Sequence, residues 1–331
     1  MLEPVIIFVI GFSLLFDVFN GFHDTANAVA SSVYTKALSP RTAIILASAL
    51  NLVGALISDK VALTIASGIV DVKLEQYVLL SAIIGAILWN LFTWWKSIPS
   101  SSSHALIGSI CGAVIAYTMS FDHVIWKSIL NKVVIPLFTS PILGLVVGYG
   151  VMKLINYIFK DKPYSKVNAL FRKLQVVSTT ALAITHGSNG AQKTMGIITL
   201  SLVTGGLIEA NSGVPFWVKL ACACMMAVGT FLGGWKVMKT MGSGVTKLTP
   251  ALGFAAQTAS ALVIETMTLI GAPVSTTHVI TSSILGVGSV KRKTAVKWGI
   301  AGNIFTAWVV TIPATMLLGF IASTLLGLIF K

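Results

Sequence analysis

A series of long apolar segments constrains this chain more than any other feature. Only 10% of its residues are charged, against about 25% in an average soluble domain. A helix needs about 20 apolar residues to cross a bilayer core. The sequence therefore excludes a soluble fold and predicts an all-α polytopic membrane protein. Apolar segments can be drawn at residues 4–35, 40–58, 75–96, 98–120, 133–158, 174–207, 216–235, 250–270, 273–289 and 298–330.

Basic residues outnumber acidic ones, 23 to 10, and give a net charge of +13. In a soluble protein this excess would suggest nucleic-acid binding. Here most basic residues lie in short loops between apolar segments, and cytoplasmic loops of membrane proteins are enriched in Lys and Arg. We therefore expect no nucleic-acid partner. We place the basic connection Lys160–Lys173 in the cytoplasm, which leaves both termini outside a cell membrane.

The same connection divides the chain into two halves of five segments. We predict a first membrane repeat at 1–160, a cytoplasmic linker at 161–173 and a second membrane repeat at 174–331. An odd number of crossings would insert the second half upside down relative to the first, as in inverted-repeat transporters. Segments 75–96 and 98–120 could instead form a re-entrant hairpin, which the charge pattern leaves open.

Two pairs of polar motifs support a duplication. Ile98-Pro-Ser-Ser-Ser-Ser-His104 matches Ala272-Pro-Val-Ser-Thr-Thr-His278, 174 residues later. Gly21-Phe-His-Asp-Thr-Ala-Asn27 aligns in position, more than in identity, with Gly187-Ser-Asn-Gly-Ala-Gln-Lys193. The order is the same in both halves, with a polar break in the first segment and a Pro-hydroxyl-His tip before the fourth helix. The sequence therefore predicts an inverted repeat with broken helices and hairpin tips.

Irregular backbone at membrane depth survives only where protein or water satisfies its polar groups. We expect four breaks, two per half, with the first segment broken at Asn20–Asp24 and the last kinked at Pro313. A helix that starts at such a break offers unpaired N–H groups and a positive dipole end to an anion. Ordinary helix caps are the alternative interpretation. The hydroxyls expected to ring a tetrahedral oxyanion belong to Ser101, Ser102, Ser103, Ser275, Thr276 and Thr277.

A carboxylate lies inside the apolar first segment. Asp24 is accompanied by His23, Asn20 and Asn27, and burying an unpaired ion costs several kcal/mol. This oxygen-rich set suits Na+ or a proton better than a transition metal. We therefore expect cation coupling at these four residues and no metal centre. The alternative interpretation is that these side chains have a structural role and form hydrogen bonds that stabilise a helix break.

Three further polar residues have open roles. Lys193 is expected in the first turn of a half-helix, where it could counter the charge of a substrate or pair with Glu265 or Asp17. His104 and His278 lie just inside the tips, where they could orient the hydroxyl loops or relay protons.

Together, the four motifs resemble the signature repeats of the PiT family of inorganic phosphate transporters, over essentially the whole chain. The resemblance implies a phosphate site at the repeat interface, with Na+ or H+ as the co-transported species. In some bacterial members the substrate is a metal–phosphate complex with H+. By resemblance, Asp24 and Asn27 fall on the cation and substrate motif of the first half, and Asn189 falls on its counterpart. A homodimer in the lipid bilayer is a further expectation.

One departure from the family pattern bears on the coupling ion. Gly190 stands where the family usually has Asp, which leaves one half short of a cation ligand. Gln192 and Lys193 form a pattern similar to bacterial proton-coupled members. The resemblance therefore favours H+.

The predicted function is secondary active import of inorganic phosphate by alternating access. An inside-negative potential opposes each negative charge by about 2.3 kcal/mol per 100 mV, so accumulation of a dianion requires co-transported cations. A sulfate or other oxyanion symporter on the same scaffold is an alternative. An intramembrane hydrolase is a remote one, because a Ser–His pairing that occurs twice fits a symmetric binding site better. We expect no catalytic residue and no cofactor beyond the transported ion.

Overall fold

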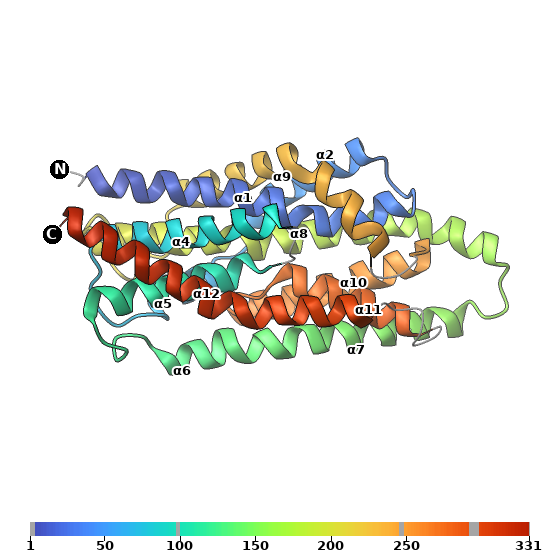
Figure 1. The fold of residues 1–331 in the computed structure, drawn as a ribbon. Coiled ribbons are helices and arrows are strands. Elements are labelled where there is room, and N and C mark those ends of the chain that lie inside the picture. The colour runs from blue at the N-terminus through green and yellow to red at the C-terminus, as the bar shows by residue number, and fades with distance from the viewer. Residues whose placement is uncertain (1–3, 97–99, 245–247, 291–297, 331) are drawn as a thin grey trace.

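The computed structural model describes residues 4–96, 100–244, 248–290 and 298–330. At residues 23, 25–27, 233–244, 300–301 and 303–304 it describes the backbone alone. The helices in chain order are α1 (Pro4–Tyr34), α2 (Pro40–Ala55), α3 (Lys60–Ser67), α4 (Gln76–Trp95), α5 (Ser102–Thr118), α6 (Trp126–Ile129), the π-helical turn η1 (Leu130–Val134), α7 (Ile135–Ile158), α8 (Tyr164–Thr204), α9 (Phe216–Gly244), α10 (Pro250–Leu269), α11 (Thr276–Ser289) and α12 (Trp298–Phe330), as Figure 1 shows.

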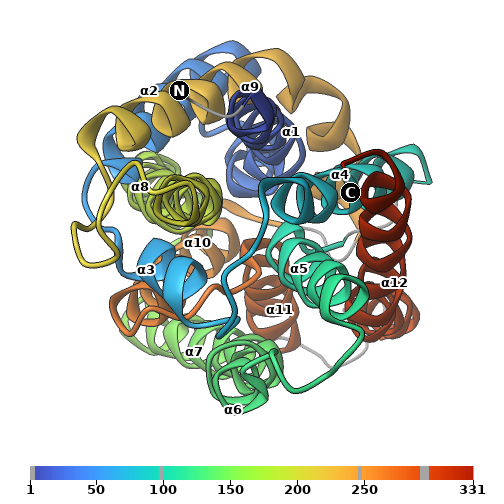
Figure 2. The same cartoon turned by 90° about the vertical axis from the view of Figure 1, so that its left-hand side faces the viewer.

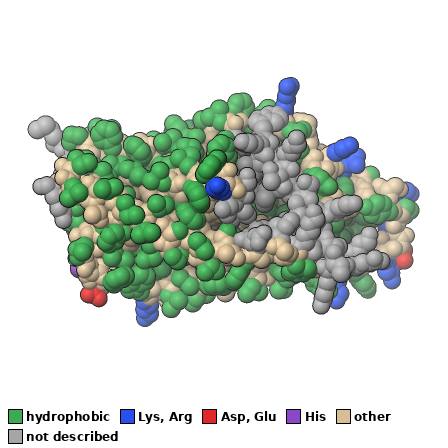
Figure 3. All heavy atoms as spheres, in the orientation of Figure 1, with side chains coloured by type: hydrophobic (Ala, Val, Ile, Leu, Met, Phe, Trp, Pro, Cys, Tyr) green, Lys and Arg blue, Asp and Glu red, His purple; other side chains and the backbone are tan. Residues whose placement is uncertain are grey.

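The described helices confirm a multi-pass, all-helical membrane protein. By length and apolar composition, five of them can cross a bilayer, within α1, α4, α6 to α7, α10 and α12. The pair α2 and α3, bent by 62°, counts as a sixth if it forms one span. Apolar side chains cover the face in Figure 3, and most Lys and Arg side chains on that face lie toward the end opposite the termini. The expected linker 161–173 is mostly the first part of α8.

Segments 75–96 and 98–120 form a hairpin that turns back inside the bundle. The Tyr117 hydroxyl at the end of α5 donates to Glu75 Oε1, just before α4, at 3.4 Å. The helices α10 and α11, which follow each other in the chain, likewise pack on each other, and both contribute to one hydrophobic cluster. A hairpin that returned to the face it left would remove two crossings from its half and keep the number per half odd. How many helices cross the membrane stays a prediction.

The helices of the two halves pack in matching pairs. Helix α1 of the first half packs on α9, and α8, which holds the matching place in the second half, packs on α2. In the same way α5 packs on α12, and α11, which holds the matching place, packs on α7. The helices α1 and α8 are antiparallel, because Thr35 bonds to Gln175 at 2.6 Å at one end while Val5 and Thr204 line one hollow at the other. Figure 2 shows α1, α4, α5, α8, α10 and α11 around the long axis. An inverted repeat predicts this pairing; the repeat and its domain boundaries stay predictions.

Two of the four predicted breaks are wrong. Helix α1 runs without interruption through Asn20–Asp24, and α8 does so through Gly187–Lys193. Continuous helices satisfy their own backbone groups, and the polar side chains of these stretches bond to other helices instead. Lys193 is therefore in the middle of α8 and not in a first turn. An unpredicted break lies between α2 and α3, where Asp59 pairs with Lys219 at 2.8 Å.

The expected kink at Pro313 falls inside the continuous helix α12. Figure 1 shows α12 changing direction near its middle, as a proline that removes one helical hydrogen bond would cause. The start of α1 and the end of α12 lie at the same end of the bundle. Which side of a membrane that end faces stays a prediction.

Two glycines let the tip helices approach their neighbours closely. A Cβ on Gly112 of α5 would collide with the carbonyl oxygen of Met316 in α12. A Cβ on Gly286 of α11 would collide with that of Leu145 in α7. The two positions are 174 residues apart, the same offset as the tip motifs. Small residues allow such close backbone packing in membranes.

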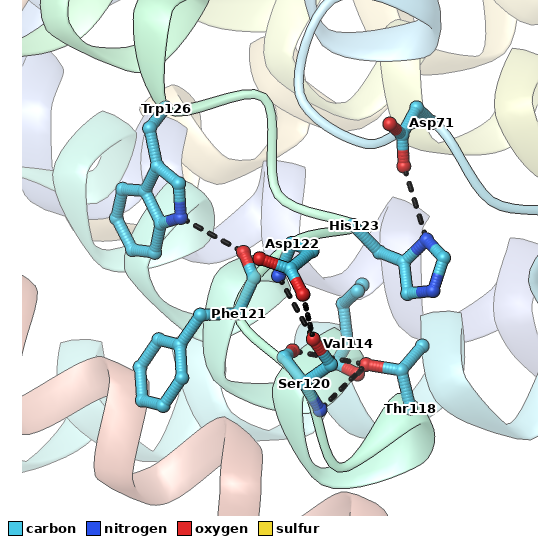
Figure 4. Close-up of polar contacts among 8 residues, drawn as sticks. All are labelled: Asp71, Val114, Thr118, Ser120, Phe121, Asp122, His123 and Trp126. Atoms are coloured by element: carbon cyan, nitrogen blue, oxygen red, sulfur yellow. Dashed lines mark hydrogen bonds and ion pairs between the residues drawn. The ribbon is translucent and has the colours of Figure 1, made fainter.

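The turn after α5 is fixed by its own polar contacts (Figure 4). The Trp126 indole donates to the carbonyl oxygen of Phe121 at 2.8 Å. His123 Nδ1 lies 3.3 Å from Asp71 Oδ1 on the connection before α4. The contact between His123 and Asp71 joins the two connections that flank the first hairpin.

Candidate functional site

The two hairpin tips meet inside the bundle. Ser101 caps α5 by accepting the backbone N–H of His104 at 3.3 Å. Ser275 caps α11 by accepting that of His278, also at 3.3 Å. The Ser103 hydroxyl of the first tip donates to the carbonyl oxygen of Val274 in the second at 2.8 Å. The N-termini of two short helices, one from each half, therefore lie side by side.

Asp24 of α1 contacts both tips and is only 2% exposed. The Ser102 hydroxyl lies 2.9 Å from Asp24 Oδ2 and 2.8 Å from Asn20 Oδ1. Thr277 of the second tip donates to Asp24 Oδ1 at 3.2 Å. Asn20 Nδ2 donates to the carbonyl oxygen of Gly190 in α8 at 3.3 Å. Because the Ser102 hydroxyl has a single proton, it can donate to only one of Asp24 Oδ2 and Asn20 Oδ1 at a time.

Lys193 brings a positive charge to the same cluster. Its side chain is 1% exposed, and Nζ donates to Ser102 Oγ at 2.9 Å. Lys193 Nζ and Asp24 Oδ2 are at most 5.8 Å apart, since each lies 2.9 Å from Ser102 Oγ. A buried charge needs such a partner, because isolating it from water costs several kcal/mol.

Asn189, one helical turn before Lys193 in α8, bonds to a different helix. Its amide nitrogen donates to Thr268 Oγ1 in the last turn of α10 at 3.0 Å. Asn189 Oδ1 and Thr276 Oγ1 are buried and have no hydrogen-bond partner among the described residues. Buried polar atoms are nearly always paired, so a polar ligand that reached either atom would satisfy it.

The rings of the two tip histidines lie against each other, tilted by 39°. The ring centroids of His104 and His278 are 5.3 Å apart, and His278 stacks on Trp308 of α12 at 3.9 Å. Both rings are buried, and none of their four nitrogens has a hydrogen-bond partner in the described part of the chain. They therefore do not orient the tip hydroxyls by hydrogen bonds; they pack the two tips together. Across the described residues, no three His, Cys, Asp or Glu gather as a metal site.

The structure thus brings together most of the residues singled out in the sequence. The side chains of His23 and Asn27 lie outside the described residues. Sequence reasoning noted Gln192 but did not predict its contact: its Oε1 accepts the backbone N–H of Val61 at 2.7 Å and so caps α3. It also missed Gln257 of α10, whose amide bonds to Ser32 at 2.9 Å. The position of Gln257 inside an apolar segment could have indicated that its side chain bonds to another helix.

Known proteins share both the sequence and the fold. The model of the phosphate transporter family matches residues 20–319. A Bacillus subtilis (strain 168) protein, described as a probable low-affinity inorganic phosphate transporter, is 47% identical over 96% of each chain. One from Rhizobium meliloti (strain 1021) with the same description is 42% identical over 95% of this chain and 94% of its own. A solved structure, "The sodium-dependent phosphate transporter", has a TM-score of 0.90 and 24% identity over 99% of this chain and 100% of that one. That likeness shows the fold.

Proposed function

Because this chain belongs to the phosphate transporter family, we propose that it imports inorganic phosphate as a secondary active symporter coupled to H+ or Na+. The family consists of transporters, so the hydrolase alternative is excluded. The proposed location is the cell membrane with both termini outside. The protein moves its substrate by alternating access, as its two halves rock about a shared site.

The observation that carries this proposal is the meeting of two helix N-termini beside Asp24 and Lys193. Helix N-termini bind phosphate readily, because their N–H groups are unpaired and their dipole end is positive. The Lys193 ammonium adds a full charge. Phosphate binds at the tips, with Asn189 and Lys193 as further ligands. The donating groups at the tips are the hydroxyls of Ser101, Ser102, Ser103, Ser275, Thr276 and Thr277.

An ionised Asp24 can lie beside a bound anion only if a cation compensates the negative charge of its carboxylate. A bare carboxylate would repel phosphate, whereas a coupling cation at Asp24 removes the repulsion. A protonated phosphate can also donate its own O–H to the carboxylate, which sulfate cannot do at neutral pH. This difference supports phosphate over sulfate, and Asp24, Asn20, Asn27 and His23 form the proposed coupling site.

The structure favours H+ over Na+ as the coupling ion. Sodium needs several oxygen ligands, yet the oxygen of Ser102 already accepts a hydrogen bond from Lys193. Gly190 adds no carboxylate, and its carbonyl oxygen already accepts from Asn20. The Lys193 ammonium thus occupies one oxygen that a sodium ion would use, and the Asn20 amide occupies another. Phosphate enters either free or as a metal–phosphate complex, and the protein is proposed to form a homodimer.

Uptake of labelled phosphate into proteoliposomes tests the proposal. We expect accumulation against a phosphate gradient when an inward proton gradient is imposed, with competition by arsenate and little by sulfate. If phosphate accumulates with neither a proton nor a sodium gradient, the symport mechanism is wrong. If sulfate blocks uptake and arsenate does not, the substrate assignment is wrong.

A further inference from the structure

Helix α1 carries a second buried acid that the proposed site does not use. Asp17 is fully buried, with 0% of its side chain exposed. It precedes Asn20 by three residues and Asp24 by seven, so all three share one face of the helix. At a rise of about 1.5 Å per residue, Asp17 lies about 10 Å along α1 from Asp24. It is therefore near the substrate site but separate from it.

The surroundings of Asp17 are mostly apolar. Its Oδ1 accepts a hydrogen bond from the Thr194 hydroxyl of α8 at 2.7 Å. Its Oδ2 meets no hydrogen-bond donor at bonding geometry in the described part of the chain. Among described residues, the titratable groups that act on this carboxyl are Lys193 of α8 and the Cys222 thiol of α9. The hydrophobic cluster around Cys222 includes Met195.

The buried charges near the site do not balance. Among the side chains that the structure describes, two buried carboxyls, those of Asp17 and Asp24, act on one buried ammonium, that of Lys193. The Ser102 hydroxyl bridges Lys193 and Asp24, whereas Asp17 accepts a hydrogen bond from the neutral Thr194 hydroxyl. Within the described residues, Asp17 therefore lacks the bridge to the ammonium that Asp24 has. An isolated ionised carboxylate in a membrane interior is costly. A bound cation removes that cost.

The chemistry around Asp17 selects a proton as that cation. A sodium ion needs several oxygen ligands, and Asp17 has one hydroxyl, one thiol and apolar neighbours beside it. A proton needs one carboxyl oxygen, and Oδ2 is available for it.

We propose that Asp17 binds a co-transported proton at a site distinct from the phosphate site. The proton adds to Oδ2, which turns the carboxylate into a neutral carboxylic acid, and leaves when the carrier opens to the other side. Thr194 links this event to the substrate site, because it follows Lys193 directly in α8. This inference rests on the proposed proton-coupled symport and adds one proton to its stoichiometry.

The test compares wild-type protein, Asp17→Asn and Asp17→Glu in proteoliposomes with the membrane potential clamped. Two readouts are needed: exchange of labelled for unlabelled phosphate without gradients, and steady-state accumulation under a pH gradient of one unit, alkaline inside. We expect Asp17→Asn to retain exchange and to accumulate tenfold less phosphate than wild type, because each coupled proton contributes a factor of ten per pH unit. Asp17→Glu restores the wild-type accumulation. Asp122→Asn, an exposed loop carboxyl, is the matched control and behaves as wild type.

Three results overturn the inference. Equal accumulation by Asp17→Asn and wild type shows that Asp17 carries no proton. Loss of exchange in a monodisperse Asp17→Asn protein assigns Asp17 to structure or phosphate binding. If wild type itself exchanges phosphate but ignores the pH gradient, the proposed proton coupling fails as well. Should Asp17→Asn not fold, Asp17→Ser, which keeps a hydroxyl for Thr194, is judged by the same two readouts.

Discussion

Ser102 and Lys193 join the two halves of the chain at its centre, with Lys193 Nζ 2.9 Å from Ser102 Oγ. One partner begins a short helix in the first half, and the other lies in the middle of the long helix α8 in the second. Both side chains are buried. The contact therefore places a helix N-terminus and a positive charge side by side, and both attract an anion.

Replacing Lys193 by Met should destabilise the protein and stop uptake. The substitution leaves the buried Asp24 without its nearby positive charge, and leaving a buried charge uncompensated typically costs about 3 to 5 kcal/mol. We expect a clear fall in the melting temperature of the purified protein and at least a tenfold loss of phosphate uptake.

Lys153, an exposed residue of α7, provides the control, and Lys153→Met should melt and transport as wild type does. A Lys193→Met protein with wild-type melting and uptake would remove Lys193 from the site.

Replacing Asp24 by Asn should abolish coupled transport. The amide keeps the size of the side chain and its ability to bond Ser102 and Thr277, but it cannot hold a proton or compensate a cation. Accumulation of labelled phosphate under a proton gradient should fall to the level of empty liposomes. Normal accumulation in this variant would show that Asp24 has no part in coupling.

Replacing Gly112 by Ala should weaken the packing of α5 on α12. The added Cβ would collide with the backbone of Met316, and overpacking of this kind costs about 1 to 3 kcal/mol. Thermal unfolding in detergent measures the effect. Gly150→Ala is the matched control, since a Cβ there meets nothing within 4 Å; equal melting temperatures for the two variants would refute the close approach.

The positions of the helices and hairpin tips follow from local signals. The length of an apolar segment predicts a helix, and a proline followed by hydroxyl residues predicts a tip such as Ser101 to His104. The expected breaks at Asn20–Asp24 and Gly187–Lys193 were wrong because a polar run inside an apolar segment has two solutions. The helix can break, or other helices can satisfy its side chains, as Ser102 does for Asn20.

The contacts that define the candidate site depend on tertiary packing. The sequence offered Asp17 and Glu265 as partners for Lys193, and the choice of Ser102 beside Asp24 follows from how α5 sits against α1 and α8. The short helix α3 was missed for the same reason, since Gln192 of α8 caps its first N–H groups from a distant part of the chain.

The central claim is that tips from both halves form one phosphate site, and equilibrium binding of labelled phosphate to the purified protein tests it most directly. Ser102→Ala represents the first tip and Thr276→Val the second, with Ser120→Ala in the exposed turn after α5 as the control. The account predicts one phosphate per chain and at least a tenfold rise in Kd for each tip variant, with no change in the control. Wild-type affinity in both tip variants would contradict it.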